Sequence, residues 1–176
     1  MIADILGEST QRFGERPCLR SFSEGRFSSL SYKELDRLAT LVSSAIIAHG
    51  VEPLERVCIV SENRPEWVVG YLGALRCGCV AVPLDSLSKP EDIRYLVRRA
   101  RARVVFCSAR FAKDLEELGE LGSLKPEMVC FDRVEGFRTL EELLVKGEKA
   151  LREGGPSQRR VPEDSDAVLI FTSGTT

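Results

Sequence analysis

The last five residues of the sequence combine hydroxyl side chains with a glycine. They are Thr172, Ser173, Gly174, Thr175 and Thr176. Glycine lets the backbone turn several N–H groups toward one point, and neighbouring hydroxyls add further donors, which suits the oxygens of a polyphosphate. By composition alone the same residues would form an ordinary surface loop. The pattern also differs from the Gly-x4-Gly-Lys-Ser/Thr loop and from the Gly-x-Gly-x-x-Gly turn, so the surrounding fold must decide between the two interpretations.

Short apolar runs alternate with amphipathic helices through most of the chain. The runs RVCIV, CVAVPL, RVVFC, MVCF and AVLIF are short and continuous, as expected of parallel strands buried on both faces. The clearest helix begins with a capping box of Ser31 and Glu34, and Gly50 ends it. This alternation predicts an α/β fold with a doubly wound, mainly parallel sheet and helices on both of its faces.

The first thirty residues follow a different pattern. A helix is predicted around Asp4 to Phe13, and the runs on either side of Glu24 and Gly25 predict a hairpin. We therefore expect residues 1–30 to form an entry segment outside the main sheet and residues 31–176 to form the α/β subdomain. Near its end, the polar segment REGGPSQRRVPEDSD is rich in Gly, Pro and Ser, which predicts a surface loop before the last strand.

The position of the hydroxyl-rich segment favours phosphate binding over an ordinary loop. In an open parallel sheet, ligands bind beyond the carboxyl ends of the strands. The predicted strand AVLIF runs directly into Thr172, so the hydroxyls and amides that follow are expected at that edge of the sheet.

Composition limits the partners and the compartment. The chain is 43% hydrophobic and 30% charged with a formal net charge of -2, so long-range electrostatics do not favour a nucleic acid or an anionic membrane. The apolar runs are far shorter than the ~20 residues that span a bilayer, which leaves peripheral membrane contact as the only kind expected. The amino terminus carries Asp4 and does not resemble a secretory signal, so we expect a cytoplasmic protein.

The cysteines and the single histidine are expected to be structural. Four of the six cysteines lie in or beside apolar runs, and the other two, Cys77 and Cys79, are separated by one glycine. They are typical of small buried side chains in a reducing compartment. His49 has no cysteine near it in sequence, which argues against zinc. It is predicted on the apolar face at the last turn of its helix, which favours a structural role over that of a general base.

The ordered blocks of the sequence resemble a known enzyme family. FTSGTT resembles the start of the phosphate loop of the acyl-adenylate-forming, or AMP-binding, ligases, whose loop continues Gly-x-Pro-Lys-Gly. Three further blocks match that family in order and spacing: LSYKELDRLA, HGVEPLERVCIVSENRPEWVVGYLGALRCGCVAVPLD and PEDIRYLVRRARARVVFC. Within the family, SENRPEW is most similar to the long-chain fatty acid CoA ligases. One departure is that Leu54 and Glu55 stand where relatives usually carry Gly-Asp, which affects a turn and not a site.

This resemblance implies a two-step acid–thiol ligase that uses ATP, Mg²⁺ and coenzyme A. A carboxylate, with a long-chain fatty acid as the leading substrate, attacks the α-phosphorus of ATP to give acyl-AMP and pyrophosphate, and coenzyme A then displaces AMP. By the same resemblance, Thr172, Ser173, Gly174, Thr175 and Thr176 bind the β and γ oxygens of ATP, and Thr172 is also a candidate magnesium contact. The loop lysine, the adenine and ribose sites, the acyl pocket and the catalytic lysine of the family have no counterpart here. We therefore expect this chain alone to be inactive and to be the amino-terminal part of a longer enzyme.

Two alternatives remain open at this stage. The chain could be a non-catalytic α/β module that binds a nucleotide or a protein, or it could belong to an enzyme that activates amino acids or aryl acids. If the chain exposes a face that the rest of the enzyme would cover, we expect it to self-associate into a homo-oligomer.

Several other side chains that could do chemistry are assigned structural roles. The arginines of RYLVRRARAR could bind the phosphates of coenzyme A, but a solvated helix face is favoured. Trp67 and Tyr71 lie four residues apart on one helix and are expected to pack. The acidic pairs of the helices, such as Glu141 and Glu142, point apart and receive no catalytic role.

Overall fold

The computed structural model describes residues 2–23, 25–116 and 126–172. Its helices are α1 (Ile2–Phe13), α2 (Tyr32–Ala48), α3 (Pro65–Arg76), α4 (Pro90–Ala100), α5 (Ala109–Glu116) and α6 (Leu140–Arg152). Its strands are β1 (Pro17–Ser23), β2 (Arg26–Ser31), β3 (Arg56–Val60), β4 (Val80–Pro83), β5 (Val104–Cys107), β6 (Glu127–Cys130) and β7 (Arg138–Thr139).

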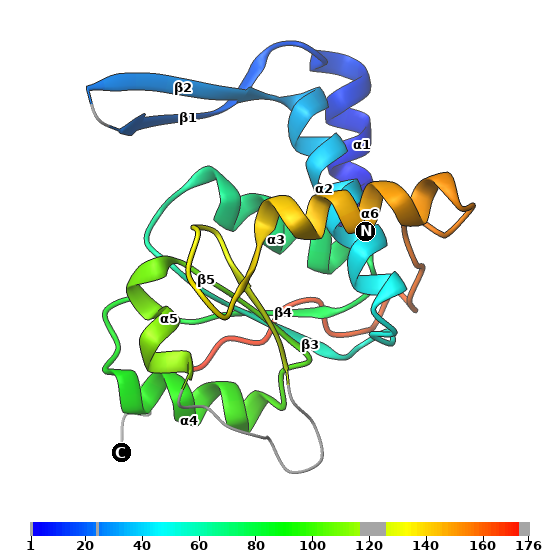
Figure 1. Ribbon diagram of the computed structural model, residues 1–176. Helices are drawn as coiled ribbons and strands as arrows, with labels where there is room; N and C mark the ends of the chain where they lie inside the picture. Colours follow the sequence, from blue (N-terminus) through cyan, green and yellow to red (C-terminus); the bar gives the residue numbers. More distant parts are fainter. Residues whose placement is uncertain (1, 24, 117–125, 173–176) are drawn as a thin grey trace.

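The main sheet has five parallel strands in the order β4-β3-β5-β6-β7. From β3 the chain moves to one side to form β4, and then crosses to the other side to form β5 (Figure 1). The strand order therefore reverses between β3 and β5, which is the topological switch point of a doubly wound sheet. The predicted fold class is confirmed.

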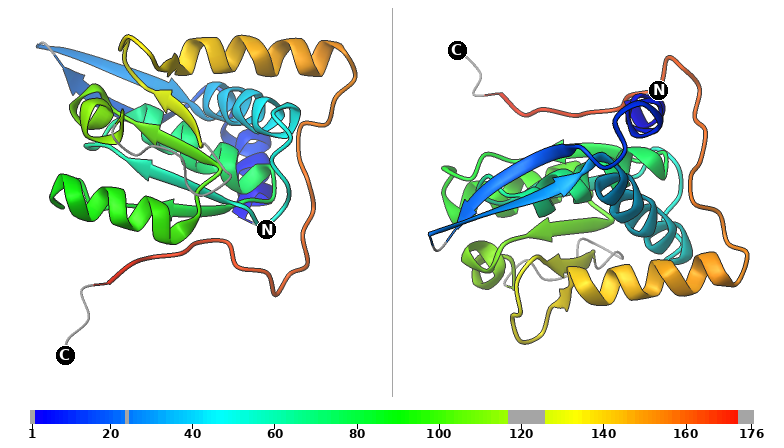
Figure 2. Two further views of the ribbon diagram at one scale, coloured as in Figure 1. Left: turned by 60° about the horizontal axis from the view of Figure 1, so that its bottom comes forward. Right: turned by 90° about the horizontal axis from the view of Figure 1, so that it is seen from above.

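Helices cover both faces of this sheet. Along β3, Val57 and Ile59 belong to the apolar cluster that contains residues of α2 and α3, whereas Cys58 and Val60 belong to the cluster that contains residues of α4 and α5. Figure 2 shows α4 on one side of the sheet, with α2 and α6 on the other. Because successive strand side chains point to opposite faces, an uninterrupted apolar run can fill both cores at once.

Helix α6 lies directly against α2 at a glycine. A Cβ atom added to Gly147 would overlap the carbonyl oxygen of Leu41, so only a residue without a side chain allows this approach. The helix begins with a capping box, in which the Glu142 amide donates to Thr139 Oγ1 at 3.1 Å and the Glu142 carboxylate accepts from the Thr139 amide at 2.9 Å. The role of Glu142 is therefore structural, as expected.

The entry segment, residues 1–30, contributes no described strand to the main sheet, although Leu6 packs in the same core. Strands β1 and β2 form a separate antiparallel hairpin, and α1 lies beside α2 (Figure 1). The predicted capping box of α2 is present: the Ser31 amide donates to Glu34 Oε2 at 2.9 Å, and the Glu34 amide donates to Ser31 Oγ at 3.2 Å. The hydrogen bonds that the Ser31 amide and hydroxyl donate to the Glu34 carboxylate hold the pKa of Glu34 below its ordinary value. Within the described part of the chain, no helix is long and apolar enough to cross a membrane.

Candidate functional site at the carboxyl edge of the sheet

Residues 153–172, here called the strap, lead from the end of α6 to the carboxyl edge of the sheet. Near its end the strap makes an isolated parallel bridge between Val168 and Ala81 of β4. The Ala81 amide donates to the Ala167 carbonyl at 3.0 Å, and the Leu169 amide donates to the Ala81 carbonyl at 2.9 Å. The strap therefore runs in the same direction as β4 where the two meet, along the edge strand of the sheet.

The prediction of a buried strand at residues 167–171 is wrong. The structure has the single bridge instead, with Leu169 39% exposed and Ile170 66% exposed. The physical reason is that this segment lies outside the edge strand β4, which is the one strand it bridges among the described residues. The apolar run was a correct indicator of extended backbone, but burial depends on neighbours that the described residues do not supply.

Thr172 follows the bridge residue Val168 by four residues and is exposed. Because the segment before it runs parallel to β4, Thr172 lies beyond the carboxyl end of that strand, where the sequence placed it. The other four predicted phosphate ligands, Ser173, Gly174, Thr175 and Thr176, lie outside the described residues. Their role in phosphate binding remains a prediction.

A charged cluster lies at the same edge, beyond the carboxyl ends of β3 and β6. Arg64 Nη1 donates to both carboxylate oxygens of Asp132 at 3.0 Å, and its Nε donates to Glu66 Oε2 at 2.9 Å. The guanidinium also lies over the ring of Phe131, 5.4 Å from its centroid. Burial disfavours the charged guanidinium, but hydrogen bonds and charges of Glu66 and Asp132 outweigh it and raise the pKa of Arg64.

The cluster extends to β5 through a second pair of contacts. The Ser108 hydroxyl, which follows β5, donates to Glu62 Oε2 at 2.7 Å, and Glu62 follows β3. Asp132 Oδ2 also accepts from the Ala109 amide at the start of α5, at 2.8 Å. We call Glu62, Arg64, Ser108 and Asp132 the edge clamp, because together they connect the ends of three strands across the switch point.

The edge clamp holds the loops after β3, β5 and β6 together and does not form a vacant anion site. Nε and Nη1 of Arg64 donate to protein carboxylates, so the charge of this residue is already paired within the protein. The sequence reasoning missed the clamp. Its signal was present, because Glu62, Ser108 and Asp132 each follow an apolar strand within two residues, and such residues meet at one edge of a parallel sheet.

His49 lies at the opposite, amino edge of the sheet, far from these groups along the strands. It caps the carboxyl end of α2, its Nε2 lies 3.5 Å from Glu127 Oε2, and its Nδ1 lies 3.1 Å from Lys146 Nζ. It lies just beyond the last residue of α2, is exposed and contacts two charged side chains, so the prediction that it lies on the apolar face of the helix is wrong. Burial is the main cause that lowers the pKa of His49, opposed by the charge of Glu127. These contacts favour the structural role that we predicted.

The remaining candidates also have structural contacts. Arg94 Nη1 donates to the Asp114 carbonyl at 3.2 Å, and Arg103 Nε lies 3.2 Å from Glu55 Oε2. Trp67 and Tyr71 stack with their ring centroids 5.1 Å apart at the margin of the core. The packing role of this aromatic pair is confirmed, while coenzyme A binding by the arginines remains untested.

All six cysteines are free, and five of them are buried. Cys107 and Cys130 stand opposite each other on β5 and β6. A hydrogen bond from Cys107 lowers the pKa of Cys130 to about 7, and that contact and burial raise the pKa of Cys107. No group of three or more His, Cys, Asp or Glu side chains that could hold a metal occurs among the described residues.

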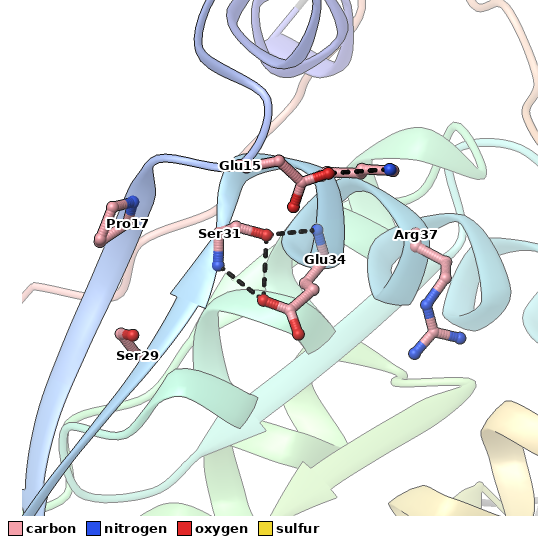
Figure 3. Close-up of a pocket in the computed structure, with 7 residues that line it drawn as sticks. Glu15, Pro17, Ser29, Ser31, Glu34 and Arg37 are labelled. Carbon is pink, nitrogen blue, oxygen red and sulfur yellow. Dashed lines mark hydrogen bonds and ion pairs between the residues drawn. The ribbon is translucent and has the colours of Figure 1, made fainter.

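A polar depression of about 390 Å³ lies between the hairpin and the start of α2 (Figure 3). It is lined by Glu15, Pro17, Ser29, Ser31, Lys33, Glu34 and Arg37. Three of the charged side chains that line it are engaged within the protein: Lys33 Nζ donates to Glu15 Oε1 at 2.8 Å, and Glu34 belongs to the capping box. The depression includes no residue of the strap or of the edge clamp, so we assign it no ligand.

The fold and the edge geometry define a doubly wound α/β unit in which the residues before Thr172 bridge to the edge strand β4. The family model of the AMP-binding enzymes matches residues 6–176. The chain belongs to the AMP-binding enzyme family.

Curated relatives carry several different activities. The chain is 35% identical over 153 residues to the 3-hydroxybenzoate–CoA ligase of Aromatoleum sp. (strain CIB), which covers 86% of this chain and 28% of that protein. It is 31% identical over 176 residues to the long-chain-fatty-acid–CoA ligase 1 of Homo sapiens, which covers 91% of this chain and 25% of that protein. The chain thus spans about a quarter of the length of these relatives.

Solved structures agree with the fold. The anthranilate CoA ligase AuaEII in complex with anthranoyl-AMP superposes with a TM-score of 0.76 at 24% identity, covering 99% of this chain and 32% of that one. The adenylation domain of the carboxylate reductase of Mycobacterium chelonae gives a TM-score of 0.80 at 18% identity, covering 98% and 32%. At these identities the likeness establishes the architecture and not the substrate.

Proposed function

We propose that this chain is the amino-terminal part of an AMP-forming acyl-CoA ligase. The observation that carries the proposal is the parallel bridge between Val168 and Ala81, which directs the chain toward the carboxyl edge of the sheet as it approaches Thr172. Ligands of open α/β sheets bind at that edge. Membership of the AMP-binding enzyme family and the short share of each relative that the chain covers also support it.

In this proposal, residues 172–176 bind the β and γ phosphate oxygens of ATP. A substrate carboxylate attacks the α-phosphorus, the bond between the α and β phosphates breaks, and acyl-AMP and pyrophosphate form. The thiol of coenzyme A then attacks the acyl carbon and releases AMP. The contribution of this chain is to hold the leaving pyrophosphate group in place with hydroxyls and backbone amides, which lowers the barrier by positioning and by charge stabilisation.

Magnesium fits the donor that the described residues offer. Mg²⁺ prefers oxygen ligands and usually keeps several waters while it binds phosphate oxygens and one or two carboxylates, so an exposed hydroxyl at the edge would supply one of its ligands. Thr172 is that residue. When bound, the metal would neutralise phosphate charge.

A long-chain fatty acid is the proposed substrate, on the basis of the SENRPEW segment. Aryl acids are the second candidate, because the 3-hydroxybenzoate–CoA ligase of Aromatoleum has a higher identity, 35%, than the human long-chain enzyme, 31%. We place the enzyme in the cytoplasm, in keeping with its six free cysteines.

The test is pyrophosphate release by the full-length protein with ATP, Mg²⁺ and coenzyme A against fatty, aryl and amino acids. We expect release that depends on a fatty acid, with aryl acids selected instead if the second candidate holds. Residues 1–176 alone are expected to release no pyrophosphate. Release by that polypeptide would contradict the proposal that activity requires the rest of the enzyme. A full-length protein inactive with every acid would contradict the ligase assignment.

Thr172→Val tests the role of the hydroxyl group in the same assay. The substitution keeps the side-chain shape and removes one hydrogen-bonding group. We expect the KM for ATP to rise about tenfold, as for the loss of one hydrogen bond to a charged group, and the Mg²⁺ requirement to shift upward. Thr10→Val is the control, because the Thr10 hydroxyl lies in the entry segment and donates to the Tyr32 carbonyl at 3.3 Å. Equal effects of the two variants would contradict the assignment.

A further inference from the structure

The strap is fastened to the amino edge of the sheet before it reaches β4. Soon after α6, the Ser44 hydroxyl of α2 donates to the Pro156 carbonyl at 2.7 Å. The next attachment is Arg159, three residues further along the strap. Both attachments lie at the opposite end of the strands from Thr172, because α2 and α3 end where β3 and β4 are about to begin.

Arg159 binds this edge through both its backbone and its side chain. Its amide donates to the Arg76 carbonyl at the end of α3 at 3.0 Å, and its Nη1 donates to the Val51 carbonyl before β3 at 2.6 Å. Nη1 also lies 3.7 Å from Glu52 Oε2. The Arg159 side chain is 24% exposed, so these contacts are partly shielded from water. One residue therefore joins the strap to the turns before two adjacent strands.

Gly78 provides the surface on which the strap lies beside Arg159. Its φ is +78°, and a Cβ added there would lie 3.0 Å from Val161 Cγ1 and 3.5 Å from Arg159 Cβ. A side chain at this position would push the strap outward in addition to straining the backbone. The close approach of two chain segments at Gly78 shows that residues 159–161, here called the seat, pack directly against the amino edge of the sheet.

Little else in the described structure holds the strap between this seat and Thr172. The bridge to β4 supplies two backbone hydrogen bonds, Leu169 and Ile170 are exposed, and Phe171 packs only partly against the core. The place where the hydroxyl-rich segment begins must therefore depend on the seat at the amino edge as well as on the bridge.

We propose that Arg159 is a positioning residue for phosphate binding: by seating the strap at the amino edge, it sets where Thr172 emerges at the carboxyl edge. This inference rests on the proposed function for its ATP readout. The structural part of the proposal, that Arg159 stabilises the bridge between the strap and β4, does not depend on the proposed function.

The first measurement follows amide hydrogen exchange in the full-length protein. Arg159→Met keeps much of the side-chain length and removes the guanidinium, and the matched control is Arg160→Met, which removes the same charge from an exposed neighbour. We expect the Ala81 and Leu169 amides to exchange about tenfold faster in Arg159→Met, the effect of losing one charge-assisted hydrogen bond, and to be unchanged in Arg160→Met. Unchanged exchange in Arg159→Met would overturn the proposal.

The second measurement separates positioning from stability in the ligase assay. We expect Arg159→Met to raise the KM for ATP about tenfold, with the KM for the carboxylic acid within about twofold, and Arg159→Lys to restore part of the loss. If the melting temperature falls while the KM for ATP stays constant, Arg159 only stabilises the fold and the proposal is wrong. A wild-type protein without ATP-dependent activity would refute the proposed function. The hydrogen-exchange experiment would still show whether Arg159 stabilises the bridge between the strap and β4.

Discussion

The two edges of the parallel sheet are held together by different means. At the carboxyl edge, side chains of the edge clamp connect the ends of three strands, with Arg64 bonded to both oxygens of Asp132. At the amino edge, backbone carbonyls also serve as acceptors between turns: the Leu54 amide donates to the Gly78 carbonyl at 2.8 Å, and Arg56 Nε donates to the Ala100 carbonyl at 2.7 Å. Ion pairs such as that of Arg103 with Glu55 add to these contacts.

This difference separates an edge that is closed by tight turns from the edge at which we propose that a ligand binds. Tight turns with left-handed residues close the amino edge, including Leu54 at φ 65° and Gly78 at φ 78°. The carboxyl edge has polar side chains and an exposed segment ending at Thr172. Binding residues are commonly carried by loops that a rigid scaffold positions. Here the strap is attached at the amino edge through Arg159, and Thr172 lies at the carboxyl edge.

The largest effect is expected from opening the edge clamp. Arg64→Met leaves Asp132 and Glu66 without their cation, so we expect the free energy of unfolding to fall by about 2 kcal/mol. The control is Arg133→Met, because Arg133 and its partner Glu141 are 89% and 79% exposed and 3.7 Å apart, and such pairs contribute well under about 1 kcal/mol. Urea denaturation of both variants measures the difference. Similar losses would show that the clamp contributes no more than a surface ion pair.

A smaller effect of opposite sign is expected at the amino edge. Leu54 has a left-handed backbone, which costs a residue with a Cβ about 1–2 kcal/mol, and it is 41% exposed, so little packing would be lost. Leu54→Gly should therefore raise the free energy of unfolding by about 0.5–1 kcal/mol after the greater entropy of glycine in the unfolded chain is subtracted. Arg101→Gly, at the left-handed cap of α4 with φ 52°, is the matched variant. Urea denaturation of both variants measures the change. A lower free energy of unfolding in both would contradict the claim that these left-handed residues cost stability.

The smallest effect on global stability is expected at the bridge between the strap and β4. Leu169→Pro removes the amide that donates to Ala81, yet we expect the free energy of unfolding to change by less than about 0.5 kcal/mol, because the segment is exposed. The Ala81 amide should exchange faster with solvent. Leu169→Ala, which keeps the amide, should leave that exchange unchanged. A loss above about 2 kcal/mol in the proline variant would mean that the strap is part of the cooperative core.

Local sequence signals predicted the elements and missed their connections. The capping box of Ser31 and Glu34 predicted the start of α2, since both partners lie within one helical turn. The hydrogen bond between Arg64 and Asp132 spans 68 positions. The order of the residues does not indicate which strand ends will be neighbours. The seat of Arg159 was missed for the same reason, because its partner Val51 is 108 positions away.

The sequence by itself determined the doubly wound class, the alternating faces of the strands and the family to which the hydroxyl-rich segment belongs. Each of these follows from patterns with a short period or from ordered motifs, which fix backbone conformation and side-chain polarity locally. Only the tertiary structure decided that residues 167–171 lie exposed against an edge strand, that Arg159 seats the strap and that the edge clamp closes over the switch point. Those features depend on which segments become neighbours, and the packing of the whole chain sets that.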